Sequence, residues 1–294
     1  VHNGANVTLV LEGANELHGQ GNKPAIWVEP GSTLTIEGTG SLSAYAGGGS
    51  AGMGSAAIGS AYGTNTSFGD ITIQSGTVYA EGSGGGAGIG GGYELGSGSV
   101  SGNITINGGW VKAIGGESLA DVTGGAGIGS GENADYTGTI TISGGAVTAT
   151  GNNTDGIRGY NDETDFSTGQ DGSALILASS ISDKFSREDW SGIIFEGNAG
   201  QLYGNPTLNM DAAIPSGKIL TIPENSVLTI GSGKTLTNNG TIGAYGEISG
   251  TLTNHGTIMV GPDGSVPSGS GGSVIPFPYD ETYLDASGTP QNIP

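Results

Sequence analysis

Three aromatic residues with polar neighbours recur at similar intervals in the first half of the chain. They are Tyr45, Tyr79 and Trp110, and Glu81 and Lys112 follow the second and third of them closely. An aromatic ring offers an apolar face to the C–H groups of a sugar, while polar neighbours bond its hydroxyls. If the three rings share one surface, they predict a glycan site. The alternative is that they only shield a sheet that loops partly cover.

A cluster of carboxylates could bind a cation. Asp155, Asp162, Glu163 and Asp165 fall within one polar segment. Oxygen-bearing side chains at such short spacing can fold around a hard cation such as calcium. The segment lacks a complete EF-hand loop, so the competing interpretation is a solvated acidic loop. Calcium is the one cofactor that the sequence suggests.

Catalytic chemistry has weaker support. A polysaccharide lyase needs cations beside its base, but the 7 Lys and Arg residues are dispersed along the chain. His2, His18 and His255 are too far apart in the sequence to suggest a metal triad. Glycosidases work with a pair of carboxylates, which the acidic segment could supply. A glycoside hydrolase acting on host or plant glycans therefore stays open as an alternative.

Charge and composition exclude several partners. The chain has 27 Asp and Glu but only 7 Lys and Arg residues, a formal net charge of −20 at pH 7. Such a chain lacks the basic surface that nucleic acids and anionic membranes require. It contains no cysteine, which excludes disulfides and zinc–thiolate sites. No apolar run is long enough to cross a bilayer, so we expect no membrane insertion.

The elements that must position these residues come from a repeat. The segment Asp70-Ile-Thr-Ile-Gln-Ser-Gly-Thr-Val-Tyr-Ala-Glu-Gly returns in similar form from Asn103 and Thr139, with a fainter copy from Thr33. The first apolar residues of the copies are Leu34, Ile71, Ile104 and Ile140, in steps of 37, 33 and 36 residues. A second signature, Ala-Gly-Ile-Gly or a variant of it, lies between the copies. A period of this length indicates a solenoid, a propeller or an array.

Each copy reads as three short strands separated by Gly-rich corners. Ile-Thr-Ile and Val-x-Ala alternate as half-buried strands do, and no window has helical spacing. This predicts an all-β fold, a right-handed parallel β-helix with one rung per ~33–37 residues. The handedness follows the general crossover rule. A propeller blade would need four strands in about 40–50 residues.

The pattern becomes tighter toward the C-terminus. From Lys218 onward, very short strands such as Ile-Leu-Thr-Ile and Thr-Leu-Thr-Asn follow one another closely and end in Gly, Pro or Asn. We therefore expect regular rungs over residues 1–165 and a continuation of the solenoid with short strands over 166–262. Residues 263–294 are expected to be a linker and the start of a following module.

The combination of Gly-x-Ile-Thr-Ile-x-Gly-Gly-x-Val-x-Ala-x-Gly with Gly-Ala-Gly-Ile-Gly resembles the repeat regions of large proteins of Gram-positive gut bacteria. These proteins are secreted or wall-anchored and are often labelled carbohydrate-binding-domain proteins. The resemblance covers residues 1 to about 262 and includes the Leu-Thr-Ile-Pro to Leu-Thr-Asn-Asn-Gly-Thr-Ile series. It implies a secreted or cell-surface location, a polysaccharide or glycoprotein glycan as partner, and a monomeric module within a longer chain. No family site residues can be carried over.

Together, these observations predict a non-catalytic glycan-binding or adhesin module of an exported bacterial surface protein. The expected ligand-binding residues are Tyr45, Tyr79, Glu81, Trp110 and Lys112. The alternatives are the glycoside hydrolase and a structural spacer without a ligand.

Overall fold

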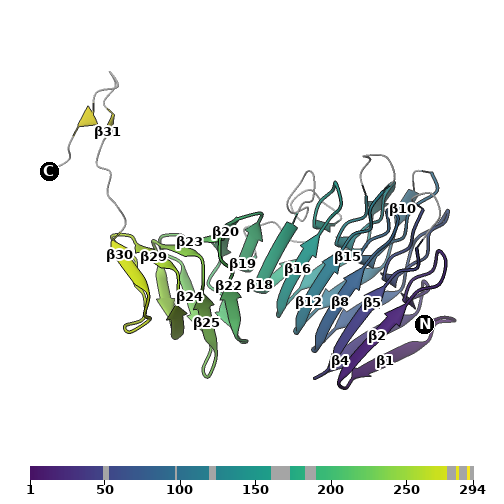
Figure 1. The fold of residues 1–294 in the computed structure, drawn as a ribbon, viewed down its shortest axis with the longest axis horizontal. Coiled ribbons are helices and arrows are strands. Elements are labelled where there is room, and N and C mark those ends of the chain that lie inside the picture. Colours follow the sequence, from purple (N-terminus) through teal and green to yellow (C-terminus); the bar gives the residue numbers. More distant parts are fainter. Residues whose placement is uncertain are drawn as a thin grey trace.

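The computed structural model describes residues 1–48, 53–96, 98–118, 124–159, 173–182, 190–276, 283–284 and 290–291. Every regular element in this part of the chain is a β-strand, and none is a helix. Most strands pair in parallel (Figure 1). The predicted all-β fold is confirmed, and the stacked parallel sheets are compatible with a β-solenoid.

Each copy of the repeat adds one strand to each of three parallel sheets, which together form the N-terminal stack. The first sheet contains β1 (Asn6–Leu11), β4 (Thr33–Gly38), β7 (Asp70–Ile73), β11 (Asn103–Ile106) and β15 (Thr139–Ile142). The second contains β2 (Ala14–His18), β5 (Ser41–Tyr45), β8 (Thr77–Glu81), β12 (Trp110–Ile114) and β16 (Ala146–Thr150). The third contains β3 (Ile26–Trp27), β6 (Ile58–Gly59), β9 (Ile89–Gly90), β13 (Ile128–Gly129) and β17 (Ile157–Arg158). A separate pair, β10 (Gly98–Val100) and β14 (Ala134–Tyr136), lies outside these three sheets.

The register of the strands matches the sequence repeat. Leu34 pairs with Ile71, Ile71 with Ile104, and Ile104 with Ile140. All four side chains are buried, as are the alternating Val and Ala residues of the second sheet. Equivalent residues of successive copies therefore lie in columns, as predicted.

A column of glycines explains the Ile-Gly signature of the third sheet. Gly59, Gly90 and Gly129 have φ angles of 139°, 137° and 123°. A Cβ at Gly90 would collide with the carbonyl oxygen of Gly129 in the next strand, so glycine is required for this close approach. Arg158 takes the equivalent position in β17, which is the last described strand of this sheet.

Three antiparallel strands interrupt the parallel order. β18 (Ser173–Ser182) runs antiparallel to β16. β19 (Ser191–Glu196) and β20 (Ala199–Tyr203) each reverse direction again, and β20 then pairs in parallel with β23 (Ile219–Ile222). The sequence predicts further strands here but does not indicate this change of direction.

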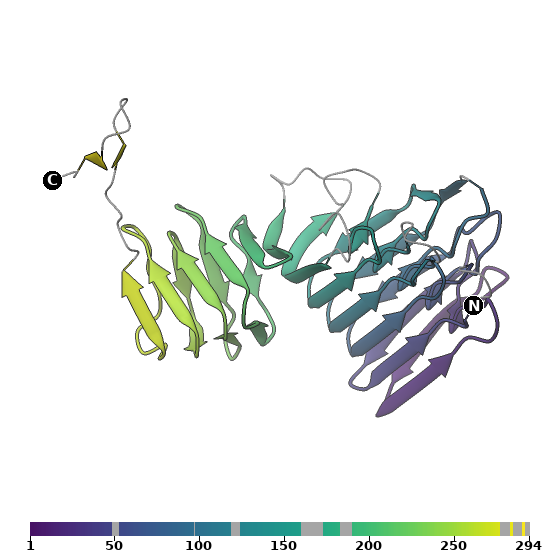
Figure 2. The same cartoon turned by 45° about the horizontal axis from the view of Figure 1, so that its top comes forward.

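The C-terminal stack again has three parallel sheets (Figure 2). The second sheet of the N-terminal stack continues through β20 into β23, β26 (Thr241–Ala244), β29 (Thr257–Val260) and β30 (Ser273–Pro276). The other two sheets are β21 (Thr207–Leu208), β24 (Val227–Ile230) and β27 (Glu247–Ser249), and β22 (Ala212–Ile214), β25 (Thr235–Asn238) and β28 (Thr251–Asn254). The short strands β31 (Tyr283–Leu284) and β32 (Pro290–Gln291) pair with each other near the C-terminus.

One sheet runs through both stacks. It buries one face in the core of the N-terminal stack and the opposite face in the core of the C-terminal stack. Val147 of β16 belongs to the first core and pairs with Ile176 of β18, which pairs with Ile194 of β19. The adjacent residues Leu177 and Ile193 pair with each other and belong to the second core. Successive side chains of a strand point to opposite faces, so β18 and β19 are buried on both. The second core therefore lies on the face that points outward in the N-terminal stack.

Candidate functional site

The predicted ligand-binding residues all lie on the outward face of the second sheet. Tyr45 of β5 pairs with Glu81 of β8, and Tyr79 of β8 pairs with Lys112 of β12. Trp110 begins β12. The alternation of each strand turns the intervening Val and Ala side chains into the core, which leaves these five outside. The structure separates them into two groups.

Three rings form a stacked column, which we call the aromatic ladder: His18, Tyr45 and Tyr79. The ring centroids of His18 and Tyr45 are 4.8 Å apart, with planes 14° from parallel. Those of Tyr45 and Tyr79 are 5.6 Å apart, with planes inclined by 50°. Lys112 Nζ lies 5.6 Å from the Tyr79 centroid, within range of a cation–π interaction. Each ring of the ladder thus contacts at least one other ring.

His18 is a member of this group that the sequence pattern did not indicate. His18 ends β2, and the register places it beside Tyr45. Its Nε2 atom is 2.5 Å from Oε1 of Glu16. Aligning Ala14–His18 with Ser41–Tyr45 would have found it, but this first copy is too irregular for the repeat pattern alone to show the match.

Tyr79 is the last ring of the ladder, and it is hydrogen-bonded to Glu81. The Tyr79 hydroxyl donates a hydrogen bond of 2.5 Å to Oε2 of Glu81. Burial, this hydrogen bond and the nearby Glu81 charge raise the pKa of Tyr79 to about 12. The phenol therefore stays protonated at neutral pH and keeps its carboxylate partner. His18 and Tyr79 are thus each bonded to a carboxylate of their own strand.

Trp110 stands apart from the ladder. Its side chain is 50% exposed, and within the described residues it makes no ring contact with another aromatic side chain. It pairs with Ala146 of β16, and Ala146 is buried in the core of the C-terminal stack. Trp110 thus lies where the outward face of the N-terminal stack meets the C-terminal stack.

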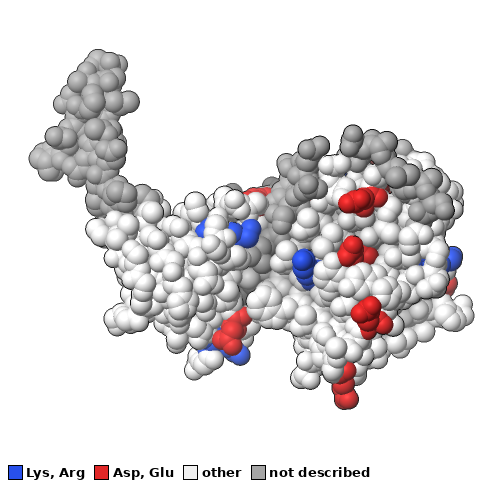
Figure 3. Space-filling view, viewed as in Figure 1, with Lys and Arg blue, Asp and Glu red and all other residues white. Residues whose placement is uncertain are grey.

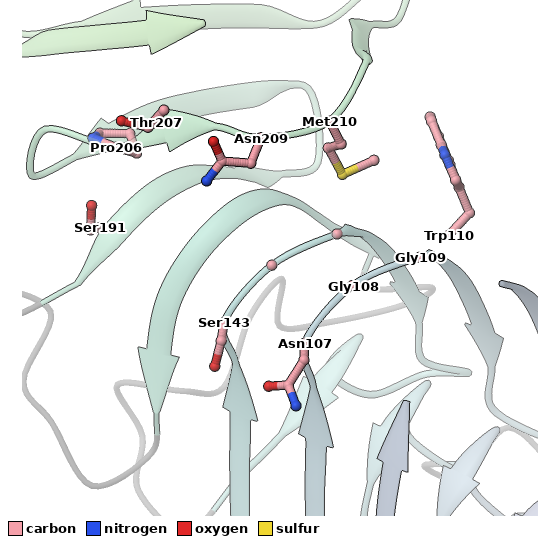
Figure 4. Close-up of a pocket in the computed structure, with 12 residues that line it drawn as sticks. Asn107, Gly108, Gly109, Trp110, Ser143, Ser191, Pro206, Thr207, Asn209 and Met210 are labelled. Carbon is pink, nitrogen blue, oxygen red and sulfur yellow. The ribbon is translucent and has the colours of Figure 1, made fainter. Parts of the chain in front are cut away.

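A pocket opens at this meeting line, with Trp110 on its wall (Figure 4). Its volume is about 570 Å³, within the range of about 300–1,000 Å³ usual for small-molecule sites. Corners between the first and second sheets form one side, and the segment around β21 forms the other. The described lining residues are Asn107, Gly108, Gly109, Trp110, Ser143, Gly144, Gly145, Ser191, Pro206, Thr207, Asn209 and Met210.

Glycine corners keep one side of the pocket open. Gly109 and Gly145 have φ angles of 84° and 86°, which glycine adopts without steric cost. A Cβ at Gly109 would collide with the carbonyl oxygen of Gly76 in the preceding copy. The glycines therefore let the corners stack closely and place no side chain of their own in the pocket.

The pocket combines apolar surface with uncharged polar groups. Met210 and Trp110 come from the two opposite sides of the pocket, and their side chains lie at the same end of it (Figure 4). Asn107 Nδ2 donates to Oε1 of Gln74 at 3.1 Å, which orients the amide and leaves its Oδ1 as an acceptor. The other polar lining side chains are Ser143, Ser191, Thr207 and Asn209.

Of the four predicted metal ligands, only Asp155 lies in the described part of the chain; Asp162, Glu163 and Asp165 lie outside it. Asp155 is 9% exposed, and its Oδ1 has no hydrogen-bond partner. Burial raises the pKa of Asp155, and the Arg158 charge opposes this. The described residues contain no group of three or more His, Asp and Glu that could hold a metal ion. Calcium binding stays a prediction.

Two further carboxylates, Glu94 and Glu132, are buried near the third sheet. Glu94 Oε2 accepts hydrogen bonds from the backbone N and the Oγ1 of Thr66, at 3.0 and 2.8 Å. Glu132 Oε2 has no partner, and burial raises the pKa of Glu132 although Ser118 donates a hydrogen bond to it. Neither carboxylate lines the Trp110 pocket.

No protein-family model, curated protein or solved structure matches this chain. The described part of the chain contains no helix that is long and apolar enough to cross a membrane. The function must therefore be inferred from the residues and their geometry.

Proposed function

We propose that this chain is a non-catalytic glycan-binding module and that a sugar ring stacks on Trp110 in the pocket between the two stacks. One observation carries the proposal: a half-exposed tryptophan on the wall of a pocket of about 570 Å³. Its indole makes no ring contact with another aromatic side chain in the described residues. An indole face that no other ring covers is available to a ligand.

The lining suits both sides of a sugar. The C–H face of a pyranose is apolar and packs on an aromatic ring. Its hydroxyls donate and accept, so they need partners that do both, as amides and hydroxyls can. Asn107, Asn209 and Ser143 supply such groups beside Trp110 and Met210. A sugar bound here would have partners for its hydroxyls as well as its apolar face.

The aromatic ladder is less suited to a sugar ring than the sequence suggested. His18 stacks on Tyr45, Tyr45 contacts Tyr79 at a tilt, and the Tyr79 hydroxyl is already bonded to Glu81. A sugar would have to displace these contacts before it could stack there. We therefore propose that the sugar ring stacks on Trp110 alone. The other predicted residues then support the second sheet and do not bind the sugar: Tyr45, Tyr79, Glu81 and Lys112.

Hydrolysis has less support than binding. Glycoside hydrolases place two carboxylates on either side of the bond that they cleave. None of the described residues that line the Trp110 pocket is an Asp or a Glu. The pocket thus offers groups that hold a sugar but not the acid–base pair that would cleave it.

The wider setting of the module is also a proposal. We propose that the stacked parallel sheets are the walls of a right-handed parallel β-helix, because a single coil would give each copy one strand in each sheet. The resemblance of the repeat to secreted or wall-anchored proteins of Gram-positive gut bacteria supports an adhesin on an exported surface protein. A structural spacer is the second candidate, since the stacked sheets would separate neighbouring modules without any ligand.

A glycan array followed by calorimetry tests the binding function. We expect the chain to bind a glycan and Trp110→Ala to weaken binding at least about tenfold, because losing an aromatic contact and its buried area costs more than about 1.4 kcal/mol. Trp27→Ala is the matched control, since Trp27 is 40% exposed but lies on the third sheet. It is expected to bind like the wild type.

Three outcomes would contradict the proposal in different ways. Unchanged affinity of Trp110→Ala would remove the site. Absence of binding to every glycan would favour the spacer. Release of reducing sugar from mucin or plant glycans would favour the hydrolase.

A further inference from the structure

The Trp110 pocket has no ionisable side chain on its described lining. Its polar groups are the amides of Asn107 and Asn209 and the hydroxyls of serine and threonine. The chain around it is strongly acidic, with a formal net charge of −20 at pH 7. In Figure 3, Asp and Glu side chains gather on the visible face of the N-terminal stack, and Lys and Arg side chains are sparse.

We propose that this pocket selects uncharged sugar residues and rejects residues that carry a carboxylate or a sulfate. The inference rests on the proposed function and names the substrate class of the same site. Neutral hexoses and N-acetylhexosamines are the expected ligands. Glycans that end in sialic acid, uronic acid or a sulfated sugar are excluded.

The first reason for this selection is desolvation. A carboxylate that enters the pocket loses part of its water shell, which is costly unless a cation or several donors replace it. Strong recognition of such groups in proteins uses Arg or Lys. One N–H of the Asn107 amide is already bonded to Gln74, so this side chain has a single N–H left for a ligand.

The second reason is the field of the surrounding chain. A net negative charge repels an anionic ligand over distances of about a Debye length. A neutral sugar does not experience this repulsion. The penalty for an acidic glycan should therefore shrink when salt screens it.

The charged residues next to the pocket do not offset the repulsion of an anionic ligand. Lys112 is two positions from Trp110, so it is on the same face, but its Nζ lies over the Tyr79 ring in the ladder. Asp211 follows Met210 and adds a negative charge, and its Oδ1 accepts a hydrogen bond from the backbone of Thr235 at 2.8 Å. No cation is directed into the pocket from its described lining.

Calorimetry with two matched ligands tests the inference. One is a neutral glycan that the array identifies, and the other is the same glycan capped with sialic acid. We expect the capped glycan to bind the wild type at least about tenfold more weakly at low salt, with a smaller difference at high salt. Asn209→Lys should narrow the difference in affinity between the two glycans, because it places a cation on the lining. Lys112→Gln should widen this difference in affinity.

Equal or tighter binding of the capped glycan by the wild type would overturn the inference and leave the glycan-binding function standing. If Lys112→Gln preferred the neutral glycan less than the wild type does, the inference would also be overturned. Lys112 would then be the residue that rejects the glycan capped with sialic acid. If the wild type binds neither glycan, the proposed function itself fails.

Discussion

Glu94 and Glu132 show how much one missing partner matters for a buried carboxylate. Both are almost fully buried, at 3% and 5% exposure. Glu94 accepts two hydrogen bonds from Thr66 through one oxygen, whereas Glu132 Oε2 has no partner. An unpaired buried charge destabilises the folded state, and a group in this position favours its protonated form. At pH 7 the charged form of Glu132 should therefore stabilise the fold less than that of Glu94.

Glu132→Gln is expected to stabilise the protein at pH 7 by roughly 1 kcal/mol, because it removes the charge from an oxygen without a partner. The raised pKa of Glu132 means that the folded state holds this proton to higher pH than the unfolded state. In the wild type, stability should fall as pH rises from the ordinary glutamate pKa of about 4.3 to the raised value. Urea unfolding at several pH values measures this slope, which should be smaller in the variant.

Glu94→Ala is the contrasting variant. It leaves the buried backbone N–H of Thr66 without its acceptor, so it should cost about 1–3 kcal/mol. If Glu132→Gln lost as much stability as Glu94→Ala, the hydrogen bond from Ser118 to Glu132 would outweigh the cost of the oxygen without a partner.

Asp155 allows a test of the calcium prediction. If its unpaired oxygen contributes to a calcium site, calcium should raise the melting temperature, as any ligand of the folded state does. A chelator should reverse the rise, and Asp155→Asn should abolish it. Identical melting curves with calcium and with chelator would count against the site.

At the scale of the element, buried asparagines hold corners of the C-terminal stack. Asn238 at the end of β25 is fully buried, and its Nδ2 donates to Oδ1 of Asn254 at the end of β28, at 2.8 Å. Each Oδ1 also accepts from a nearby backbone N–H, that of Gly240 or Gly256, at 3.1 Å. The repeated Leu-Thr-Asn motif therefore ends a strand and fixes the turn that follows it.

Asn238→Ala is expected to destabilise the protein by about 1–3 kcal/mol, since it leaves the Gly240 N–H without its acceptor and removes the hydrogen bond to Asn254. The adjacent Asn239 is exposed, so Asn239→Ala should change stability by less than about 0.5 kcal/mol. Denaturant unfolding of the two variants measures the difference. Equal stabilities would mean that the buried asparagine column contributes nothing.

At the scale of the whole molecule, β18 and β19 connect the two cores. Ile194 packs in the first core and Ile193 in the second, although they are consecutive residues. If one stack unfolded and β18 and β19 unfolded with it, apolar surface in the core of the other stack would be exposed. We therefore expect the two stacks to unfold together.

Ile193→Ala and Ile194→Ala test this coupling. Each should cost about 2–5 kcal/mol, as buried Ile→Ala changes usually do, and each should shift one common unfolding transition in calorimetry. Trp190, which is buried in the first core, should report the same transition by fluorescence in both variants. A separate transition that responds only to Ile193→Ala would show that the stacks unfold independently.

The candidate site was only partly predictable from the sequence. Period and alternation were sufficient to place Tyr45, Tyr79, Glu81 and Lys112 together, because each copy repeats the same contacts with its neighbours. They could not separate Trp110 from this group. That separation depends on the segment of Pro206, Thr207, Asn209 and Met210, which is far from Trp110 in the chain and outside the regular repeat.

The sequence by itself determined the all-β class, the stacking register and the inward columns of the N-terminal stack. These depend on contacts between equivalent residues, which a fixed period records. Only the tertiary structure decided where, along the sheet that runs through both stacks, the buried core passes from one face to the other. The apolar runs Leu175–Leu177 and Ile193–Phe195 indicate strands buried on both faces, but not which neighbour covers each face. The C-terminal stack covers the outward face of the N-terminal stack there, and this packing creates the Trp110 pocket.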